Sequence, residues 1–187
     1  MLNINIIFIR HGEPNYADCE KRNFIGQARD FSPLTDLGII QAETVSQSRK
    51  LCDAELIISS PYTRALQTAA IISRQTQIPI KVEIDLHEFL SDKSFSHNDR
   101  DTVDFLHKEF CKNKGEKNPD GLYNWETLNE IILRTYNVLL KYTQYQKIII
   151  VSHGGVIRRY VGKKDIEYCK PYEIEFNQNF KCYGWID

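Results

Sequence analysis

The sequence predicts an α/β protein built on a largely parallel β-sheet. Short apolar segments rich in β-branched residues alternate along the chain with stretches whose apolar residues recur at helical spacing. This alternation is typical of βαβ units, in which a helix crosses back over the sheet between two parallel strands. The length of 187 residues suits one domain, which we expect to span residues 1–187.

Four segments are predicted as strands that are covered on both faces, because each is a nearly continuous apolar run. They are residues 4–9, 56–59, 80–83 and 147–151. A further pair of segments, 172–176 and 181–185, flanks the turn-forming residues 177–179. We expect this last pair to form a hairpin.

Three stretches between the strands carry apolar stripes at helical spacing. The first stripe consists of Leu37, Ile40, Val45, Leu51 and Cys52. The second consists of Tyr62, Ala65, Leu66, Ala69 and Ile72, and the third of Leu128, Ile131, Ile132, Thr135, Leu139 and Tyr142. Ser60 followed by Pro61 predicts a capped helix start before the second stripe. Thr127 and Glu130 have the spacing of a capping box before the third.

Residues 88–124 differ from the rest of the chain because they are charged and carry only one modest helical run, near 103–110. A long segment of this kind inside a compact domain commonly has a functional role. We interpret it as an insertion or lid over one end of the sheet, and a second small domain is the alternative.

The charge balance and the cysteines argue against several classes of protein, such as nucleic-acid-binding and disulfide-rich proteins. The chain has 24 basic and 25 acidic residues, and a net charge of -1 predicts neither a nucleic acid nor a membrane as partner. No two of the five cysteines are closely spaced, which argues against a disulfide framework and a thiolate zinc site. The first residues do not resemble a signal peptide, and no apolar run approaches the roughly 18 residues of a membrane helix. We expect a cytoplasmic protein, and the sequence does not indicate its oligomeric state.

Reactive side chains follow three of the predicted strands. Arg10 and His11 follow the first strand, and Arg64 lies in the first turn of the helix after the second. His153 and Gly154 follow the fourth. Because the carboxyl ends of parallel strands share one edge of the sheet, where open α/β sheets bind ligands, we expect these residues to form one site.

These residue types suit phosphoryl transfer. The guanidinium groups of Arg10 and Arg64 match phosphate oxygens, and backbone N–H groups near Gly154 add donors. A neutral imidazole can attack phosphorus through one ring nitrogen when a backbone carbonyl holds the N–H of the other. The neighbouring cations and His153 disfavour protonation of His11 by repulsion. The pattern therefore predicts a phosphohistidine on His11.

An alkoxide leaving group needs a proton, and Glu88 is the candidate donor. Leu86, Phe89 and Leu90 flank it, and we expect them to desolvate the carboxyl group and raise its pKa, as a general acid requires. The resulting carboxylate would then take a proton from the water that attacks the phosphohistidine. The alternative proton donors are His87, Asp85 and Asp92.

The ordered motifs resemble the histidine phosphatase superfamily, and more narrowly its phosphoglycerate-mutase-like branch. The resemblance extends from about Ile7 to Ile157. It consists of Arg10-His11-Gly12, Ser32-Pro33-Leu34-Thr35 with Gly38, Gln41 and Ala42, the segment 59–69, and Ser152-His153-Gly154-Gly155. Glu126-Thr127 with Arg134 also resembles the Glu-Ser helix start of the family.

The resemblance implies a three-layer α/β/α sandwich that needs no metal and no cofactor. It implies that His11 is the phosphorylated nucleophile and that Arg10 and Arg64 grip the phosphoryl group. It further implies that His153 bonds a phosphoryl oxygen and that Glu88 donates the proton. The chain departs from the family pattern in two places. Ala17 stands where the family often has Asn, for which Asn15 and Asn23 are possible substitutes, and no regularly spaced glycines follow Glu88.

The leading hypothesis is a phosphatase that acts on a small phosphorylated metabolite or a phosphoprotein. A phosphoglycerate mutase is the alternative within the family, but a mutase must exclude water and retain the intermediate, and this short chain lacks the extra segments that would grip the substrate. A non-catalytic phosphate-binding module is the third hypothesis. We expect residues 17–31 and 88–124 to determine the substrate.

Overall fold

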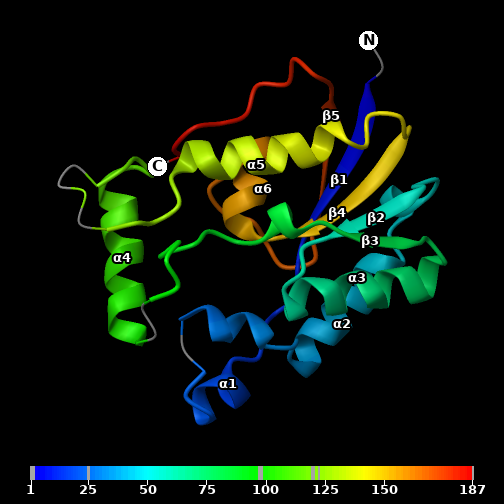
Figure 1. Cartoon of the computed structure of the whole chain (residues 1–187). Coiled ribbons are helices and arrows are strands. Elements are labelled where there is room, and N and C mark those ends of the chain that lie inside the picture. The colour runs from blue at the N-terminus through cyan, green and yellow to red at the C-terminus, as the bar shows by residue number, and fades with distance from the viewer. Residues whose placement is uncertain (1–2, 25, 97–98, 119–120, 122, 187) are drawn as a thin grey trace.

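The computed structural model describes residues 3–24, 26–96, 99–118, 121 and 123–186. At its centre lies a five-stranded sheet with the strand order β3-β2-β4-β1-β5 (Figure 1). The strands are β1 (Ile4–Arg10), β2 (Leu56–Ser59), β3 (Ile80–Val82), β4 (Lys147–Ser152) and β5 (Pro171–Phe176). The first four predicted strands therefore form, each within one residue of its expected ends.

Four of the strands are parallel and β5 is antiparallel to its neighbour β1. The predicted hairpin at the end of the chain is wrong, because residues 181–185, all of them described, form no second strand. The N–H of Tyr183 instead donates to the carbonyl of Arg159 in helix α6 (Gly154–Val161), and the side chain of Arg159 donates to the carbonyl of Gly184. The terminal segment is therefore attached to α6 and does not pair with β5.

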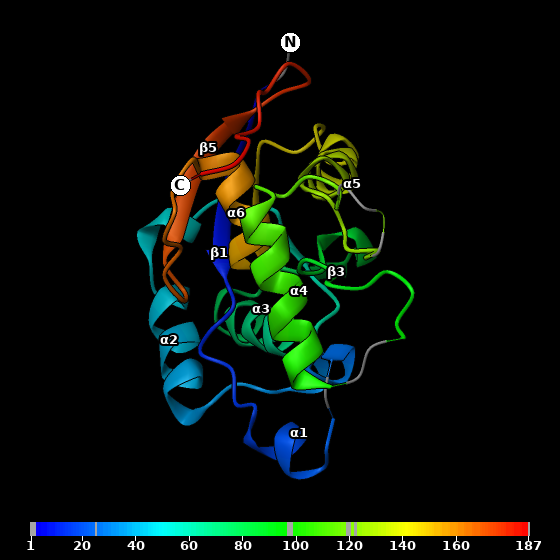
Figure 2. The same cartoon turned by 90° about the vertical axis from the view of Figure 1, so that its left-hand side faces the viewer.

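Helices cover both faces of the sheet, which confirms the α/β fold. On one face α5 (Leu128–Leu140) and α6 pack in one hydrophobic cluster with Phe8 of β1. On the other face α2 (Asp36–Ser46) and α3 (Thr63–Thr76) pack in a second cluster with Ile9. Successive side chains of a strand point to opposite faces, so β1 contributes to both clusters. The result is the predicted three-layer arrangement (Figures 1 and 2).

The predicted apolar stripe of α2 is wrong in its first half. Leu37 and Ile40 are 51% and 56% exposed, whereas Gly38 and Ala42 face inward. The reason is a close approach between α2 and the loop after β1. A Cβ atom at Gly38 would lie 2.3 Å from the carbonyl oxygen of Glu13, and one at Gly12 would lie 2.5 Å from the carbonyl oxygen of Gly38. Only small residues fit at this contact, so large apolar residues are excluded from it.

The start of α3 also differs from expectation. The helix begins at Thr63 with Tyr62 as the N-cap residue, and no side chain caps it. Ser60, the predicted cap, lies in the candidate site described below. The predicted capping box of α5 is confirmed: the Thr127 hydroxyl accepts the N–H of Glu130, and the Glu130 carboxylate accepts the N–H of Thr127.

The remaining elements are short, apart from one helix in the 88–124 segment. They are α1 (Ala17–Lys21) and the 3-10 turns η1 (Gly26–Phe31), η2 (Arg49–Leu51) and η3 (Ile84–Leu86). Helix α4 (Arg100–Lys112) contains the predicted helical run and lies at one side of the molecule, next to the start of α5 (Figures 1 and 2). Its buried residues Leu106 and Phe110 join the cluster of α5 and α6. Residues 97–98, 119–120 and 122 of this segment lie outside the described part of the chain.

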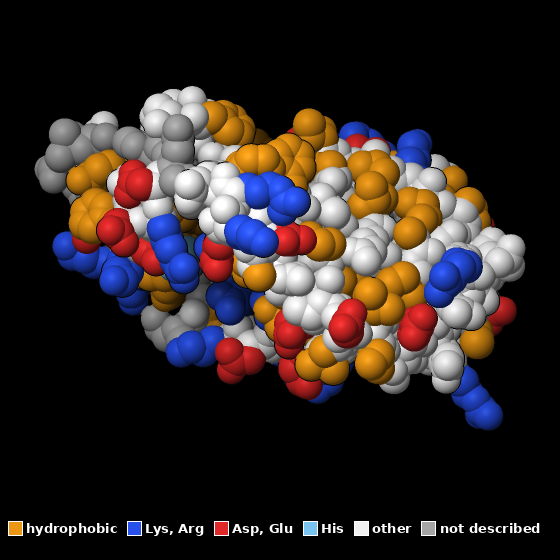
Figure 3. All heavy atoms as spheres, turned by 90° about the horizontal axis from the view of Figure 1, so that it is seen from below, with side chains coloured by type: hydrophobic (Ala, Val, Ile, Leu, Met, Phe, Trp, Pro, Cys, Tyr) orange, Lys and Arg blue, Asp and Glu red, His pale blue; other side chains and the backbone are white. Residues whose placement is uncertain are grey.

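One face of the molecule mixes both signs of charge with apolar side chains. On the face seen from below, acidic and basic groups are interspersed with hydrophobic ones (Figure 3). Within the described residues, no helix is both long enough and apolar enough to cross a membrane.

Candidate active site

The site lies where β1, β4 and β2 end beside one another. Arg10 pairs with Ser152 in the register of β1 and β4, and Ser59 pairs with Val151 in that of β2 and β4. The next residue of each strand therefore enters the same region, because parallel strands end at one edge of the sheet. The N–H of His11 donates to the carbonyl of Ser152 at 3.0 Å and continues the ladder into the site.

His11 is buried, and its ring has one defined tautomer. Nδ1 lies 2.7 Å from the carbonyl oxygen of Gly12, and the Arg64 Nε–H donates to Nε2 at 3.2 Å. A carbonyl only accepts and a guanidinium only donates, so Nδ1 carries the proton and Nε2 carries the lone pair. Burial, together with the charges of Arg64 and Arg10, lowers the pKa of His11 to about 3. The imidazole is therefore neutral at physiological pH.

Arg64 connects the two histidines to Asp30, a residue that no sequence motif marks, in the 17–31 segment. Besides donating to His11, its Nη1 donates to Asp30 of η1 at 2.8 Å, and its Nη2 lies 3.5 Å from Nδ1 of His153. The arginine is buried in the first turn of α3, and Thr68, one turn further along the helix, accepts the N–H of Gly12. Its position is thus fixed on three sides.

His153 is completely buried directly before α6. Its Nε2 lies 2.7 Å from the Ser60 hydroxyl, and its ring centre lies 5.1 Å from that of His11. Burial, then Arg64 and His11, lower the pKa of His153 well below its ordinary value. Ser60 therefore contacts this histidine, although we predicted it as a helix cap.

Arg10 approaches the site from the end of β1. Its Nη1 donates to the carbonyl of Ile166 at 2.8 Å, and its guanidinium lies 4.0 Å above the ring of Tyr168. A Cβ atom at Gly154 would lie 3.7 Å from Nε of Arg10, so the arginine borders the first turn of α6. Among the described residues, no group accepts the buried Nε–H of Arg10. This donor is available to an anion.

Glu88 reaches the same end of α6. Its carboxylate accepts the N–H of Phe89 at 3.0 Å and the N–H of Gly155 at 3.2 Å. A Cβ atom at position 155 would lie 2.4 Å from Oε1 of Glu88, so any side chain here would force the carboxylate to shift from its present position. Glu88 is therefore bound to the first turn of α6, the helix that His153 precedes.

Of the other candidate proton donors, His87 and Asp85 line the cavity beside Tyr62, with the His87 ring 6.2 Å from that of Tyr62, whereas Asp92 is bonded within its own loop. The carboxylate of Asp92 accepts hydrogen bonds from Ser94 and Ser96 within its own loop. Asp85 has its carbonyl oxygen bonded to Arg134, and Nδ1 of His87 lies 2.7 Å from the carbonyl oxygen of Glu88. The predicted substitutes for Asn at position 17 have the following local structure. Asn15 accepts the N–H of Ala17 in a local turn, and exposed Asn23 has a φ of 54°.

A nearly buried ion pair holds the segment that carries Glu88. Arg134 of α5 bonds the carboxylate of Glu126 and also donates to the carbonyl oxygens of Asp85 and Glu88. The backbone of Glu126 donates to Leu90, and its carboxylate accepts the Leu90 N–H. The Glu126 and Arg134 motif in the sequence thus positions residues 85–90.

Two aromatic residues complete the site. The ring of Tyr62 lies 5.1 Å from that of His153, and the guanidinium of Arg64 lies over it at 5.1 Å. The ring of Tyr168 lies 5.6 Å from that of His11. The sequence pattern assigns Tyr62 to a helical stripe, and no motif marks Tyr168 or Asp30. Across the described part of the chain, no three side chains of His, Cys, Asp or Glu gather closely enough to hold a metal ion.

The family follows from comparison of the whole sequence. The model of the histidine phosphatase superfamily (branch 1) matches residues 6–172. This chain belongs to the histidine phosphatase superfamily. The uncharacterized phosphatase PhoE of Bacillus subtilis is 30% identical over 156 residues, which cover 81% of this chain and 72% of that protein. The probable phosphoglycerate mutase GpmB of Proteus mirabilis is 26% identical, with coverage of 81% and 70%.

A solved structure supports the fold of this histidine phosphatase superfamily member. The crystal structure of the alpha-ribazole phosphatase from Shigella flexneri aligns with a TM-score of 0.69. The alignment covers 98% of this chain and 96% of that one, at 24% sequence identity. At this identity the likeness shows a shared fold.

Proposed function

We propose that this histidine phosphatase superfamily member hydrolyses phosphomonoesters through a phosphohistidine on Nε2 of His11. The observation that carries the proposal is the state of this ring. Its Nδ1–H is held by the carbonyl of Gly12, and its lone pair is on Nε2 in a cluster with Arg64 and His153. A neutral imidazole with a fixed tautomer is a nucleophile that needs no separate base.

In the first step the phosphoryl group binds between Arg10, Arg64 and the backbone N–H of Gly154. The Arg64 Nε–H, which rests on Nε2 of His11, moves onto a phosphoryl oxygen and frees the lone pair for attack. A bond forms between Nε2 and phosphorus while the ester P–O bond breaks. The guanidinium groups stabilise the charge that spreads over the equatorial oxygens in the transition state.

In the free site Nη2 of Arg64 faces Nδ1 of His153; once the guanidinium has moved onto the phosphoryl group, His153 bonds one of those oxygens through Nδ1, which requires that the ring proton shift to that nitrogen. The Ser60 hydroxyl supports this role, because it can donate to Nε2 as well as accept from it. The neutral ring then donates to the phosphoryl group without a change in its charge. We assign Ser60 as a positioning residue on this ground.

Glu88 supplies the proton to the leaving alkoxide as a carboxylic acid. In the second step its carboxylate accepts a proton from a water molecule, which attacks phosphorus and breaks the bond to Nε2. Phosphate leaves, and Nε2 regains its lone pair. The contact between Glu88 and Gly155 supports this assignment, since it places the carboxyl group at the helix end that borders Arg10. No metal or cofactor takes part in this scheme.

We further propose a cytoplasmic enzyme of one domain whose substrate is a small phosphorylated metabolite or a phosphoprotein. The five free cysteines support a reducing compartment. A phosphoglycerate mutase would show rapid isomerisation of 3-phosphoglycerate with little hydrolysis of a generic aryl phosphate. A non-catalytic binding module would show the same negligible hydrolysis in the parent protein and in the His11→Ala variant.

The test is to quench the reaction of a ³²P-labelled aryl phosphate and to look for an acid-labile, base-stable adduct. We expect the label on His11 and a rate at least about 10⁴-fold lower in His11→Ala, with the fold intact. His107→Ala, at an exposed histidine of α4, is the matched control and keeps both the label and the rate. Label on another residue, or substantial turnover by His11→Ala, contradicts the proposal.

A further inference from the structure

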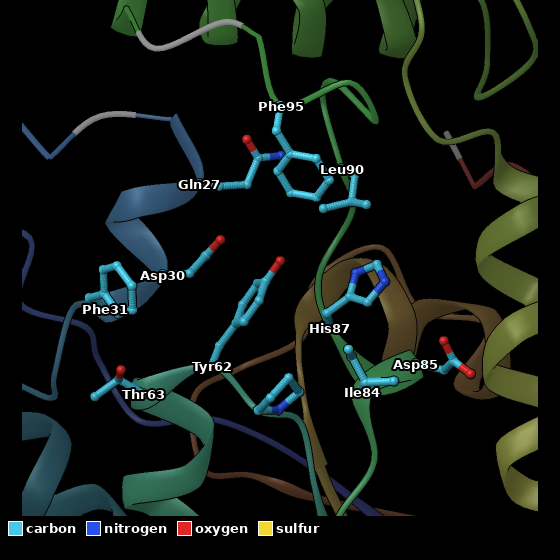
Figure 4. A pocket seen from close by; sticks show the side chains of 11 residues that line it. Gln27, Asp30, Phe31, Tyr62, Thr63, Ile84, Asp85, His87, Leu90 and Phe95 are labelled. Atoms are coloured by element: carbon cyan, nitrogen blue, oxygen red, sulfur yellow. The ribbon is translucent and has the colours of Figure 1, made fainter.

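A cavity of about 490 Å³ opens beside the phosphate site. Its wall comes from η1, from the start of α3 and from residues 84–95, which are far apart in the sequence. In Figure 4, Tyr62 stands in the middle of the cavity wall, with Asp30 on one side and His87 on the other. The volume is in the usual range for pockets that bind small molecules.

The cavity and the phosphate site share two residues. Asp30 lines the cavity and bonds Arg64, and Tyr62 lines it and packs edge-on against His153. A phosphoryl group held by Arg64 and His153 would therefore extend its ester oxygen toward this space. The cavity is the place for the rest of the substrate molecule.

Part of the lining is apolar and unusually exposed. Phe31, Ile84 and Phe95 are 68%, 71% and 61% exposed, although all three are large hydrophobic side chains. Apolar surface gathered in a concave site commonly marks a binding region. Contact with an aromatic ring would remove this surface from water.

The charged lining residues are acidic. Asp30 and Asp85 line the cavity, and the described residues that form its lining include no lysine or arginine. The Asp30 carboxylate bonds Nη1 of Arg64. A carboxylate on the substrate would therefore compete with Asp30 for this cation. An acidic group on the substrate would meet the carboxylates of Asp30 and Asp85 and no cationic side chain in the described lining that is free to bond it.

We propose that this cavity binds an aromatic leaving group without acidic substituents, and that Asp30 is the residue that rejects carboxylated substrates. The inference rests on the proposed phosphatase function and gives the substrate class for the same site. It also separates this chain chemically from an enzyme for 3-phosphoglycerate, whose carboxylate the cavity disfavours.

Stable phosphonates test the proposal without any contribution from leaving-group reactivity. We would measure by calorimetry the Kd values of ethylphosphonate, benzylphosphonate and 4-carboxybenzylphosphonate. We expect benzylphosphonate to bind about tenfold more tightly than ethylphosphonate, because its ring covers apolar surface. The added carboxylate should weaken binding about tenfold through repulsion by Asp30.

Two variants assign these effects to residues. Asp30→Asn should reduce the carboxylate penalty to about twofold, whereas Asp53→Asn, at the amino end of β2 on the opposite edge of the sheet, should leave it unchanged. Ile84→Ala should lower the preference for the benzyl group about threefold, and Leu133→Ala, at an exposed leucine of α5, should not.

The proposal is overturned if benzylphosphonate and ethylphosphonate bind equally, or if the carboxylate penalty is absent or survives Asp30→Asn. Its failure is distinguishable from failure of the proposed function. Equal binding with intact labelling of His11 refutes the substrate class alone, whereas no binding of any phosphonate together with no label on His11 refutes both.

Discussion

The phosphate site and the cavity beside it are built in different ways. Around His11 and His153 the side chains are buried, follow regular strands and are held by backbone atoms. Around Phe31 and Phe95 the side chains are exposed and come from irregular segments. The reaction needs fixed geometry, whereas a leaving group needs only a surface of suitable shape and charge. Substitutions should therefore have large effects in the first region and graded effects in the second.

The comparison is tested most severely by Arg64→Ala. This change removes the donor to His11, the partner of Asp30 and the neighbour of His153 together. We expect kcat/KM for an aryl phosphate to fall about 1000-fold, because the transition-state charge loses a buried cation. Steady-state kinetics measures the loss, and circular dichroism checks the fold. A folded variant within tenfold of the parent would mean that the phosphate site is less dependent on fixed groups than we infer.

Glu88→Gln tests whether a residue of the phosphate site acts on the leaving group, which we place in the cavity. We expect kcat for an alkyl phosphate to fall about 100-fold, since a poor leaving group needs the proton most. The rate with 4-nitrophenyl phosphate should fall less than about tenfold, because that leaving group departs without protonation. Parallel kinetics with both substrates measures the ratio. Equal slowing of the two would remove Glu88 as the acid.

Burial of neutral histidines makes the stability of the phosphate site depend on pH. The pKa of His11 falls from 6.5 to about 3 on folding, so below pH 6.5 the unfolded chain binds a proton that the folded chain does not. The free energy of unfolding should therefore decrease as pH falls, and His11 contributes about 2 kcal/mol of this decrease by pH 5. Urea unfolding at pH 7 and pH 5 measures it. His11→Asn should reduce the difference, and an unchanged difference would contradict the buried neutral ring.

The smallest effect is expected in the cavity. Phe31→Ala alters a side chain that is 68% exposed, so the free energy of unfolding should change by no more than about 0.5 kcal/mol. The Kd of benzylphosphonate should rise about threefold, because the ring loses one apolar contact. Denaturation and calorimetry measure the two quantities. A large loss of stability would show that the cavity wall is part of the core.

Sequence patterns predicted the regions in which local chemistry determines structure. The strands follow from continuous apolar runs, and the start of α5 follows from Thr127 and Glu130. Patterns failed where a contact with a part of the backbone distant in sequence determines which side chains are buried. Leu37 and Ile40 have helical spacing, but the close contact of Gly38 with Glu13 turns the opposite face of α2 inward. That contact joins residues that are far apart in the sequence, so helical periodicity cannot predict it.

The site shows the same division. His11, Arg64 and His153 were predicted because each follows a strand, and the structure brings them together. Asp30 was missed because it lies in an irregular loop without a motif, and only the folded chain places it against Arg64. Ser60 was misassigned because a serine before a proline also fits a helix cap, while its actual partner, His153, is distant in sequence.

The contact between Gly12 and Gly38 has a consequence for how this chain tolerates mutation. Neither residue is expected to touch the substrate, yet the carbonyl of Gly12 sets the tautomer of His11, and the backbone of α2 presses against that same loop. A side chain at either position would push the loop and tilt the imidazole. In a saturation library selected for activity, we expect both positions to be depleted of variants as strongly as the nucleophile itself, whereas a screen for solubility alone would rank them far lower.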